Sequence, residues 1–149
     1  MIRPTSYLLL CLALAACARE TSPEDEIRAV VAAAEEAAES RDASALFDLV
    51  APDYQDARGN AAEEIRRYVR GYLVTHQSIH LLTRVDEIEI LASDLARLRA
   101  TVGMLGREAG AESSWDLAGD VYEFDVTLAR EEGEWLVTRA AWRRGGLTD

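Results

Sequence analysis

The sequence predicts an α+β domain in which three N-terminal helices pack on a curved, mainly antiparallel β-sheet. Apolar residues recur at helical spacing through residues 23–73, whereas from residue 78 onward apolar and polar residues alternate. The clearest alternation lies in a hairpin pattern over residues 120–142, and its apolar members are Tyr122, Phe124, Val126 and Leu128. A hairpin alone is barely stable, so we expect the upstream helices to cover its apolar face.

The first predicted helix begins at Ser22 and Pro23, since Ser22 can cap and proline suits the first helical position. Its apolar stripe comprises Ile27, Val30, Val31, Ala34 and Ala38, and Glu35, Glu36 and Glu39 are predicted to face water. Asp42 is predicted to cap a short helix over residues 43–50, which Pro52 ends. Asn60 and Glu63 are predicted to form a capping pair for a third helix over residues 61–73.

Strands are predicted over residues 78–83, 85–91 and 95–105, before a loop over 106–117 and the hairpin. Arg97 and Arg99 alternate with apolar residues, so we expect them on the wet face, paired with acids across strands. The alternative is that both arginines line a pocket and bind an anion. Trp135 and Trp142 are predicted to join the core.

The N-terminus carries an export signal. Arg3 precedes a short apolar stretch over residues 7–16, which is typical of a secretory signal peptide. The segment Leu14-Ala15-Ala16-Cys17 resembles the lipobox of bacterial lipoproteins, a family in which the signal is removed before the cysteine and the cysteine is acylated. The alternative is ordinary signal cleavage, with Cys17 incidental.

The lipobox resemblance implies a signal peptide over residues 1–16 and a lipidated tether over 17–22, before the domain at 23–144 and a tail at 145–149. Palmitate-type acyl chains would anchor the protein to a membrane through Cys17, because each buried methylene adds about 0.8 kcal/mol. Ala18 follows the cysteine, and by resemblance to enterobacterial sorting this favours the outer membrane, facing the periplasm.

Composition excludes several function classes. The net charge is −11, and nucleic acid binding needs a basic surface, so we expect no nucleic-acid partner. His76 and His80 are the only histidines, and a structural zinc needs four ligands, so we expect no metal. The sequence has no glycine-rich phosphate loop, and we expect no cofactor.

The order of elements resembles the nuclear transport factor 2-like superfamily, which includes ketosteroid isomerase-like and SnoaL-like proteins. The resemblance rests on the helix from Ser22, the Asp42 cap, the helix from Asn60, the strand over 96–102 and the closing strand from Gly133-Glu134-Trp135. It covers residues 24–144 and implies a cone-shaped, cystatin-like roll with a pocket at its wide end. The fold hosts isomerases, hydrolases, dehydratases and non-catalytic binders, so it does not determine function.

Ketosteroid isomerase-like proteins use an acid as the base and a tyrosine as an oxyanion donor, and Asp56 and Tyr54 are the catalytic candidates of this type. The surrounding segment 53–59 is predicted to be a loop at the pocket rim. The binding candidates are Asp53, Tyr54, Asp56, Arg58, Tyr72, His80 and Trp115. The structural alternatives are turn and capping bonds for Asp53 and Asp56, and core packing for Tyr68 and Tyr72.

Three functions follow as hypotheses. The first is a membrane-anchored lipoprotein whose domain binds a small apolar or amphipathic molecule, or a protein partner, without catalysis. The second is an isomerase- or hydrolase-type enzyme with an Asp/Tyr pocket. The third is an envelope assembly accessory that uses the open sheet face, including a homodimer through the sheet. An apolar pocket supports the first two, and an exposed apolar sheet patch supports the third.

Overall fold

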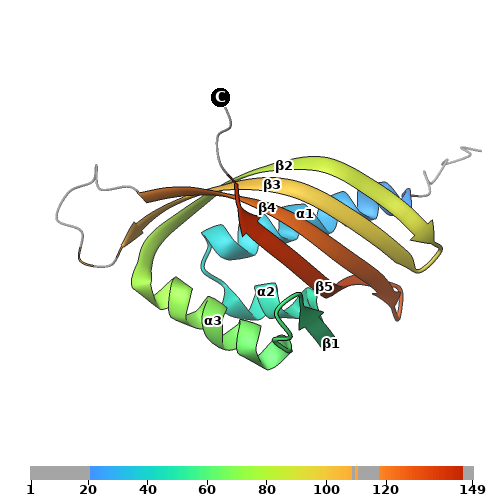
Figure 1. Ribbon diagram of the computed structural model, residues 1–149, viewed down its shortest axis with the longest axis horizontal. Coiled ribbons are helices and arrows are strands. Elements are labelled where there is room, and N and C mark those ends of the chain that lie inside the picture. Colours follow the sequence, from blue (N-terminus) through green and yellow to red (C-terminus); the bar gives the residue numbers. More distant parts are fainter. Residues whose placement is uncertain (1–20, 109, 111–117, 146–149) are drawn as a thin grey trace, which may run out of the picture.

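The computed structural model describes residues 21–108, 110 and 118–145 (Figure 1). Its elements are, in chain order, α1 (Pro23–Glu39), α2 (Ala43–Asp48), β1 (Val50–Asp56), α3 (Ala62–Thr75), β2 (His76–Ala92), β3 (Leu95–Glu108), β4 (Ala118–Glu131) and β5 (Glu134–Arg144). Cys17 and Trp115 lie outside the described residues. Within the described ranges, no helix combines the length and the apolar character needed to cross a membrane.

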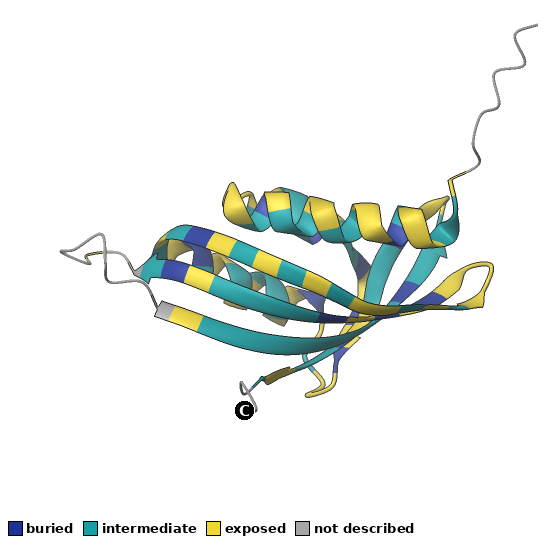
Figure 2. Ribbon diagram, turned by 90° about the horizontal axis from the view of Figure 1, so that it is seen from above, coloured by how far each residue is buried: buried dark blue, intermediate teal, exposed yellow. Residues whose placement is uncertain are grey.

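One mixed sheet arches over the helices (Figure 1). Its strand order is β1-β5-β4-β3-β2; β2 to β5 form an antiparallel meander, and β1 pairs with β5 in parallel. Figure 2 shows α1 lying along the sheet with most of its exposed residues on the outer side. The predicted α+β class is confirmed, and the helices precede the long strands as expected.

Two of the predicted helix caps are present. The Asp25 N–H donates to Ser22 Oγ at 3.1 Å, and the Ala45 N–H donates to Asp42 Oδ1 at 3.0 Å. The predicted pair of Asn60 and Glu63 is wrong by one position. The Ala61 N–H instead donates to the Glu64 carboxylate at 2.9 Å, which leaves the Asn60 side chain free to serve the turn before the helix.

The predicted loop at 53–59 is wrong over most of its length, because residues 50–56 form β1 and the preceding helix ends at Asp48. Pro52 lacks an N–H and is tolerated here since β1 is an edge strand. The partner of β1 lies far downstream in β5, and the pairing register shifts between Val50 and Gln55, so no clear alternation marks the strand.

The remaining differences concern strand ends. The two strands predicted over 78–91 are one continuous strand, β2, with a register irregularity between Val85 and Glu87. Strand β3 also extends into the predicted 106–117 loop and ends at Glu108, and β4 starts at Ala118, two residues before the predicted start of the hairpin. In each case strand pairing continues through residues whose local pattern is irregular.

The most deeply buried part of the core lies where α1 meets β3, β4 and β5. Ile27 of α1 and Leu128 of β4 are fully buried there, in a cluster with Ala96, Leu98 and Trp135. Glu26 links α1 to β4 and β5 beside this cluster, because its carboxylate accepts hydrogen bonds from Trp135 Nε1 at 2.8 Å and from the Arg130 guanidinium. A second cluster joins Tyr54 of β1, Ala62 of α3 and Ala140 of β5.

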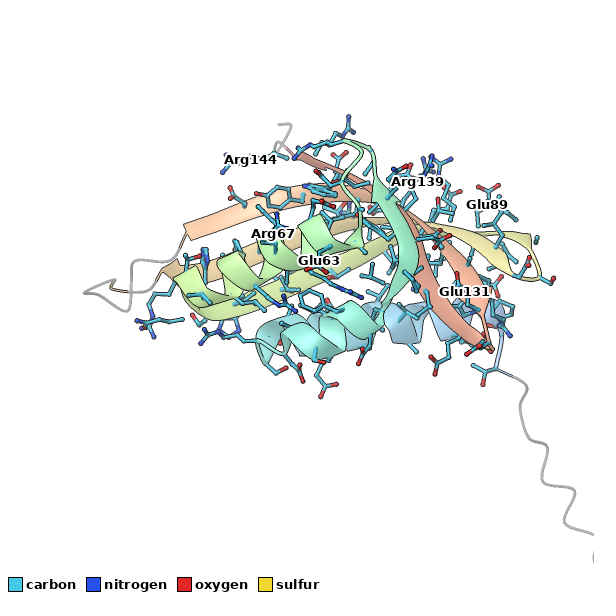
Figure 3. All side chains as sticks on the ribbon, turned by 90° about the horizontal axis from the view of Figure 1, so that it is seen from below. Glu63, Arg67, Glu89, Glu131, Arg139 and Arg144 are labelled. Carbon is cyan, nitrogen blue, oxygen red and sulfur yellow. The ribbon has the colours of Figure 1, made fainter. Side chains whose placement is uncertain are left out.

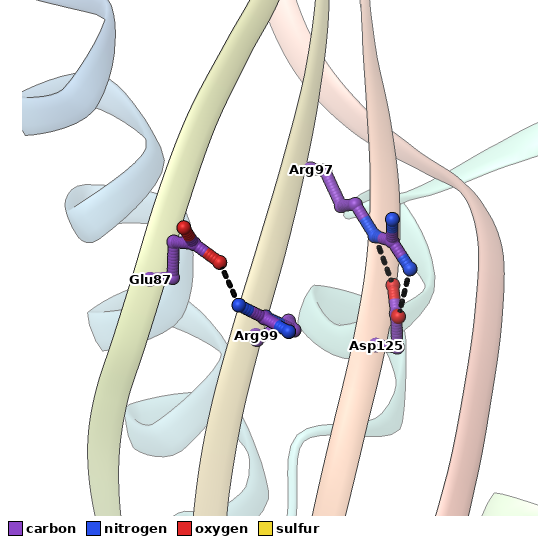
Figure 4. A network of polar contacts seen from close by, with 4 residues as sticks. All are labelled: Glu87, Arg97, Arg99 and Asp125. Carbon is purple, nitrogen blue, oxygen red and sulfur yellow. Dashed lines mark hydrogen bonds and ion pairs between the residues drawn. The ribbon is translucent and has the colours of Figure 1, made fainter.

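Ion pairs cover the outer face of the sheet. Arg97 Nε donates to Asp125 Oδ1 at 2.8 Å, and Arg99 pairs with Glu87 (Figure 4). Arg143 pairs with Glu123 on the same face. The prediction that Arg97 and Arg99 lie on the wet face is confirmed. The alternative, in which both arginines line the pocket on the inner side of the sheet, is wrong, because neither lines the cavity there.

Candidate functional site

A cavity of about 410 Å³ lies between the helices and the inner side of the sheet. Small-molecule sites typically measure about 300–1,000 Å³, so the space suits a compact organic ligand. Its walls are mainly apolar and include Val30 and Val31 of α1, Val69 of α3, Val102 of β3, Val126 of β4 and Trp142 of β5.

The periodicity of the sequence explains these walls. Strand β3 turns Leu98, Ala100 and Val102 inward, as the alternation predicted, while Arg99 and Thr101 point outward. Helix α3 turns Ile65 and Val69 to the cavity and exposes Glu63 and Arg67 on its charged side (Figure 3). The apolar side of α3 and the inward-facing apolar residues of β3 therefore line the same cavity.

Few polar groups interrupt the apolar walls. Four tyrosines and one threonine supply hydroxyls, and Glu35 is the one charged residue among the described lining residues; the hydroxyls belong to Tyr54, Tyr68, Tyr72, Tyr122 and Thr83. A small number of polar groups on apolar walls is the usual composition of a small-molecule site.

Tyr54 is the most buried of the tyrosines, at 4% exposed, and β1 holds it against α3 and β5. Burial raises its pKa to about 12, and the charge of Asp56 contributes to the same increase. The phenol therefore stays protonated at neutral pH and keeps an O–H that can donate. Among the described residues, no hydrogen bond engages this hydroxyl.

The other three tyrosines gather toward the opening. Tyr68 lines the cavity although it is 67% exposed, so it marks the entrance. Burial raises the pKa of Tyr72 above its ordinary value, and the nearby Tyr122 and Tyr68 raise this pKa further. The ring of Tyr72 also stacks on His76, with centroids 3.9 Å apart, which fixes its orientation.

Asp56 does not line this cavity. It is 5% exposed, and its carboxylate accepts hydrogen bonds from the Arg58 N–H and the Asn60 N–H, each at 2.8 Å, and from Asn60 Nδ2 at 2.7 Å. Burial raises the pKa of Asp56, but the hydrogen bonds from Asn60 and Arg58 outweigh burial and leave this pKa below its ordinary value. This geometry matches the structural alternative, a turn at the end of β1, while a catalytic role for Asp56 stays an untested prediction.

The fold places only some of the predicted binding residues at the cavity. Tyr54 and Tyr72 line the cavity. Asp53, Arg58 and His80 are exposed and lie outside the lining, with the Arg58 guanidinium over the Trp142 ring at 5.3 Å. Trp115 lies outside the described residues. No group of three or more potential metal ligands occurs in the described parts of the chain.

Glu35 was predicted to face water, and the structure corrects this by placing it at the cavity wall. It follows Ala34 directly and lies four residues after Val31, so it sits at the edge of the apolar stripe of α1. At such a position, helical periodicity alone does not predict whether a side chain faces the cavity or the solvent. Tyr122 and Trp142 also line the cavity, and the alternation of β4 was sufficient to place Tyr122 inward.

A second hollow, of about 700 Å³, lies on the outer face of the sheet. Its charged residues include Arg99, Glu123 and Asp125, which are already paired across strands. A ligand there would have to displace exposed ion pairs in water. We therefore place the candidate site in the inner cavity.

No family model matches the sequence, and no curated protein matches it. Solved structures do match. A candidate scytalone dehydratase from Novosphingobium aromaticivorans is 12% identical, with a TM-score of 0.73 over 83% of this chain and 84% of that one. A candidate dehydratase of the NTF2-like family from Streptomyces avermitilis is 15% identical, with a TM-score of 0.70 over 82% of this chain and 96% of that one.

The same fold appears in a protein of a different kind. A candidate calcium/calmodulin-dependent protein kinase II association domain from Xanthomonas campestris is 14% identical, with a TM-score of 0.70 over 85% of this chain and 91% of that one. Together these similarities show that the chain has the nuclear transport factor 2-like fold, as the order of its elements predicted. At such low identity they establish the fold alone.

Proposed function

We propose that this protein binds a small apolar or amphipathic molecule in the inner cavity and does so without catalysis. The observation that carries the proposal is the cavity itself, an apolar space of about 410 Å³ with hydroxyl groups placed on its walls. The dehydratase names of two structural neighbours agree with a site for small organic molecules, although the third neighbour is named as an association domain.

Catalysis through the predicted Asp56 base is disfavoured because of where Asp56 lies. Asp56, the predicted base, is held in a turn outside the cavity, and the described lining residues supply one carboxylate, that of Glu35. General acid–base chemistry needs a base within hydrogen-bond reach of the substrate. Tyr54 offers a protonated donor, which suits recognition of a carbonyl or hydroxyl oxygen.

Binding of the neutral dye Nile red tests the proposal. The variant Val102→Phe fills the cavity and is expected to weaken dye binding about tenfold or more, since the added ring occupies the apolar space. Thr101→Phe is the matched control, because Thr101 is the adjacent residue on the opposite face of β3. Equal affinity in the wild type and Val102→Phe would place dye binding elsewhere and contradict the proposal.

One specific observation still supports the enzyme hypothesis, which is the hydroxyl of the buried residue Tyr54 on the cavity wall. Incubation with a panel of ketosteroids, epoxides and hydroxylated aromatic compounds, followed by product analysis, tests it. Turnover that falls in Tyr54→Phe but not in Tyr68→Phe would favour an enzyme. Ligand binding with no product in any case would favour the binder.

We further propose that the domain is anchored to the cell envelope through acylation of the Cys17 thiol, because Cys17 ends the lipobox-like sequence Leu14-Ala15-Ala16-Cys17. Expression of the full chain with Cys17→Ser is expected to give an unacylated protein that leaves the detergent phase. Mass analysis of the mature N-terminus reads the modification directly. A Cys17→Ser protein that stays acylated would end the lipoprotein hypothesis.

The sheet face supports a secondary role in assembly. Leu82 is 72% exposed and Leu105 is 40% exposed, and both point to the outer side, where Leu82 pairs with Gly103 across the sheet. Exposed apolar side chains on a sheet suit contact with a second copy of the chain or another envelope protein. Sedimentation of the wild type and of Leu82→Glu tests self-association through this face.

A further inference from the structure

We propose that the inner cavity selects apolar molecules with a positively charged head, such as alkylammonium amphiphiles, over those with an anionic head. This inference rests on the proposed function and adds the ligand class. The charge and the aromatic faces on the cavity wall carry it, together with the positions of the nearest arginines.

Glu35 supplies the charge. It lies on α1 between cavity-lining residues, with Ala34 before it, Val31 one turn earlier and Ala38 one turn later. It is half-buried, and within the described residues it makes no ion pair and no hydrogen bond. An unpaired carboxylate on an apolar wall attracts a cation more strongly than one in bulk water, because the lower local dielectric screens the interaction less.

Aromatic rings supply the second element of the site. Tyr68, Tyr72 and Tyr122 line the same cavity, and Tyr68 marks its entrance. The face of an aromatic ring is negative, so rings gathered around a cation stabilise it, and quaternary ammonium groups are commonly recognised in this way.

The fold brings the carboxylate and the rings to the same end of the molecule. Arg41, just after α1, donates through Nη2 to the Leu73 carbonyl of α3 at 2.7 Å. This contact ties the last turn of α1, which follows Glu35, to the turn of α3 that holds Tyr72. The Leu81 N–H donates to the Glu39 carboxylate at 2.8 Å and holds the same end of α1 against β2.

Two arginines at this end are engaged elsewhere. Arg41 bonds the Leu73 carbonyl, and Arg144 pairs with Asp120, the acid that accepts from the Tyr122 hydroxyl at 3.5 Å. Neither arginine is among the lining residues. An anionic head would therefore meet Glu35 without a compensating cation on the described wall, whereas a cationic head would meet a partner. The net charge of −11 also raises the local concentration of cations.

Three decyl probes with different heads test the inference: decyltrimethylammonium, decanol and decanoate, each below its micelle concentration and each measured by displacement of Nile red. We expect the ammonium probe to bind about tenfold or more tightly than decanoate, with decanol between them. Glu35→Gln is expected to reduce the affinity for the ammonium probe about tenfold, with a smaller effect on decanol. Glu36→Gln is the matched control, since it removes the same charge from the adjacent, exposed position.

The outcomes separate the two proposals. If no decyl probe binds, the proposed function fails, and the ligand class fails with it. If decanol binds but decanoate binds as tightly as the ammonium probe, the cavity is a ligand site without charge selection, and this inference alone is overturned. Equal effects of Glu35→Gln and Glu36→Gln would assign the preference to the overall charge of the protein and overturn the role of Glu35.

Discussion

Tyr54 and Asp56 stand two residues apart on β1 and meet different surroundings. Tyr54 points into the cavity, whereas Asp56 points into a turn in which Asn60 and the Arg58 backbone surround its carboxylate. Both were candidates because their residue types suit acid–base chemistry. Residue type alone did not show which of them would face a ligand, since this depends on an edge strand that pairs with a distant part of the chain.

Replacing Asp56 is expected to affect stability. Asp56→Ala removes the acceptor of three hydrogen bonds in a buried turn, so we expect a loss of about 1–3 kcal/mol in the free energy of unfolding. Urea unfolding measures the loss, and Nile red binding should stay unchanged because Asp56 lies outside the cavity. Unaltered stability with loss of dye binding would return Asp56 to the site.

The same residue predicts a pH dependence. Its pKa in the folded protein lies below the ordinary value of 3.8, so the folded state favours the carboxylate. The stability that this carboxylate contributes is complete above pH 3.8 and is lost as the pH falls through the lower folded pKa. We therefore expect the stability difference between the wild type and Asp56→Asn to shrink below about pH 4. A difference that grows on acidification would contradict this assignment.

Leu128 and Phe124 both point from β4 to the inner side of the sheet, but Leu128 is more deeply buried than Phe124. Leu128 is fully buried in a cluster with Ile27 and Trp135, so Leu128→Ala is expected to cost about 2–5 kcal/mol. Phe124 is only partly buried and stacks with Trp142, so Phe124→Ala should cost less. Asp125→Ala breaks an exposed ion pair and should cost about 0–1 kcal/mol. Thermal unfolding ranks the three, and a larger loss at Asp125 than at Leu128 would mean that the strand register is different.

At the scale of elements, strong local patterns predicted the fold well. The stripe of α1, the caps at Ser22 and Asp42, and the alternation in β3 and β4 are all present in the structure. β1 was not predicted, because Pro52 suggested a break and the strand depends on parallel pairing with β5. The size and position of the cavity were also beyond the sequence, since they depend on how far the sheet curves away from the helices.

The connection of α1 to the β4–β5 hairpin gives an element-scale prediction. Glu26 holds both Arg130 and the Trp135 indole, so Glu26→Ala is expected to lower the free energy of unfolding by about 1–3 kcal/mol. Glu24→Ala, at an exposed position in the same turn of α1, is the control. Similar stability of the two variants in urea unfolding would show that this contact does not hold the helix to the hairpin.

For the whole molecule, the buried core and the cavity adjoin each other. Ile27 and Trp135 belong to the buried cluster alone, Leu128 belongs to the cluster and to the cavity wall, and the four tyrosines lie on the walls of the cavity. The outer face of the sheet carries arginines paired with acids, whereas Glu35 lies at the cavity wall without a partner among the described residues. The proposed ligand site therefore borders the core and shares Leu98 and Leu128 with it.

Methyl NMR of the domain titrated with decanol tests the central claim most directly. If the cavity is a ligand site, the methyl resonances of Val30, Val69, Val102 and Val126 should shift and saturate together, because these side chains line one space. The exposed methyl groups of Leu82 and Leu105 on the outer face should not move. Saturable shifts confined to Leu82 and Leu105, or no shifts at any concentration, would contradict the account.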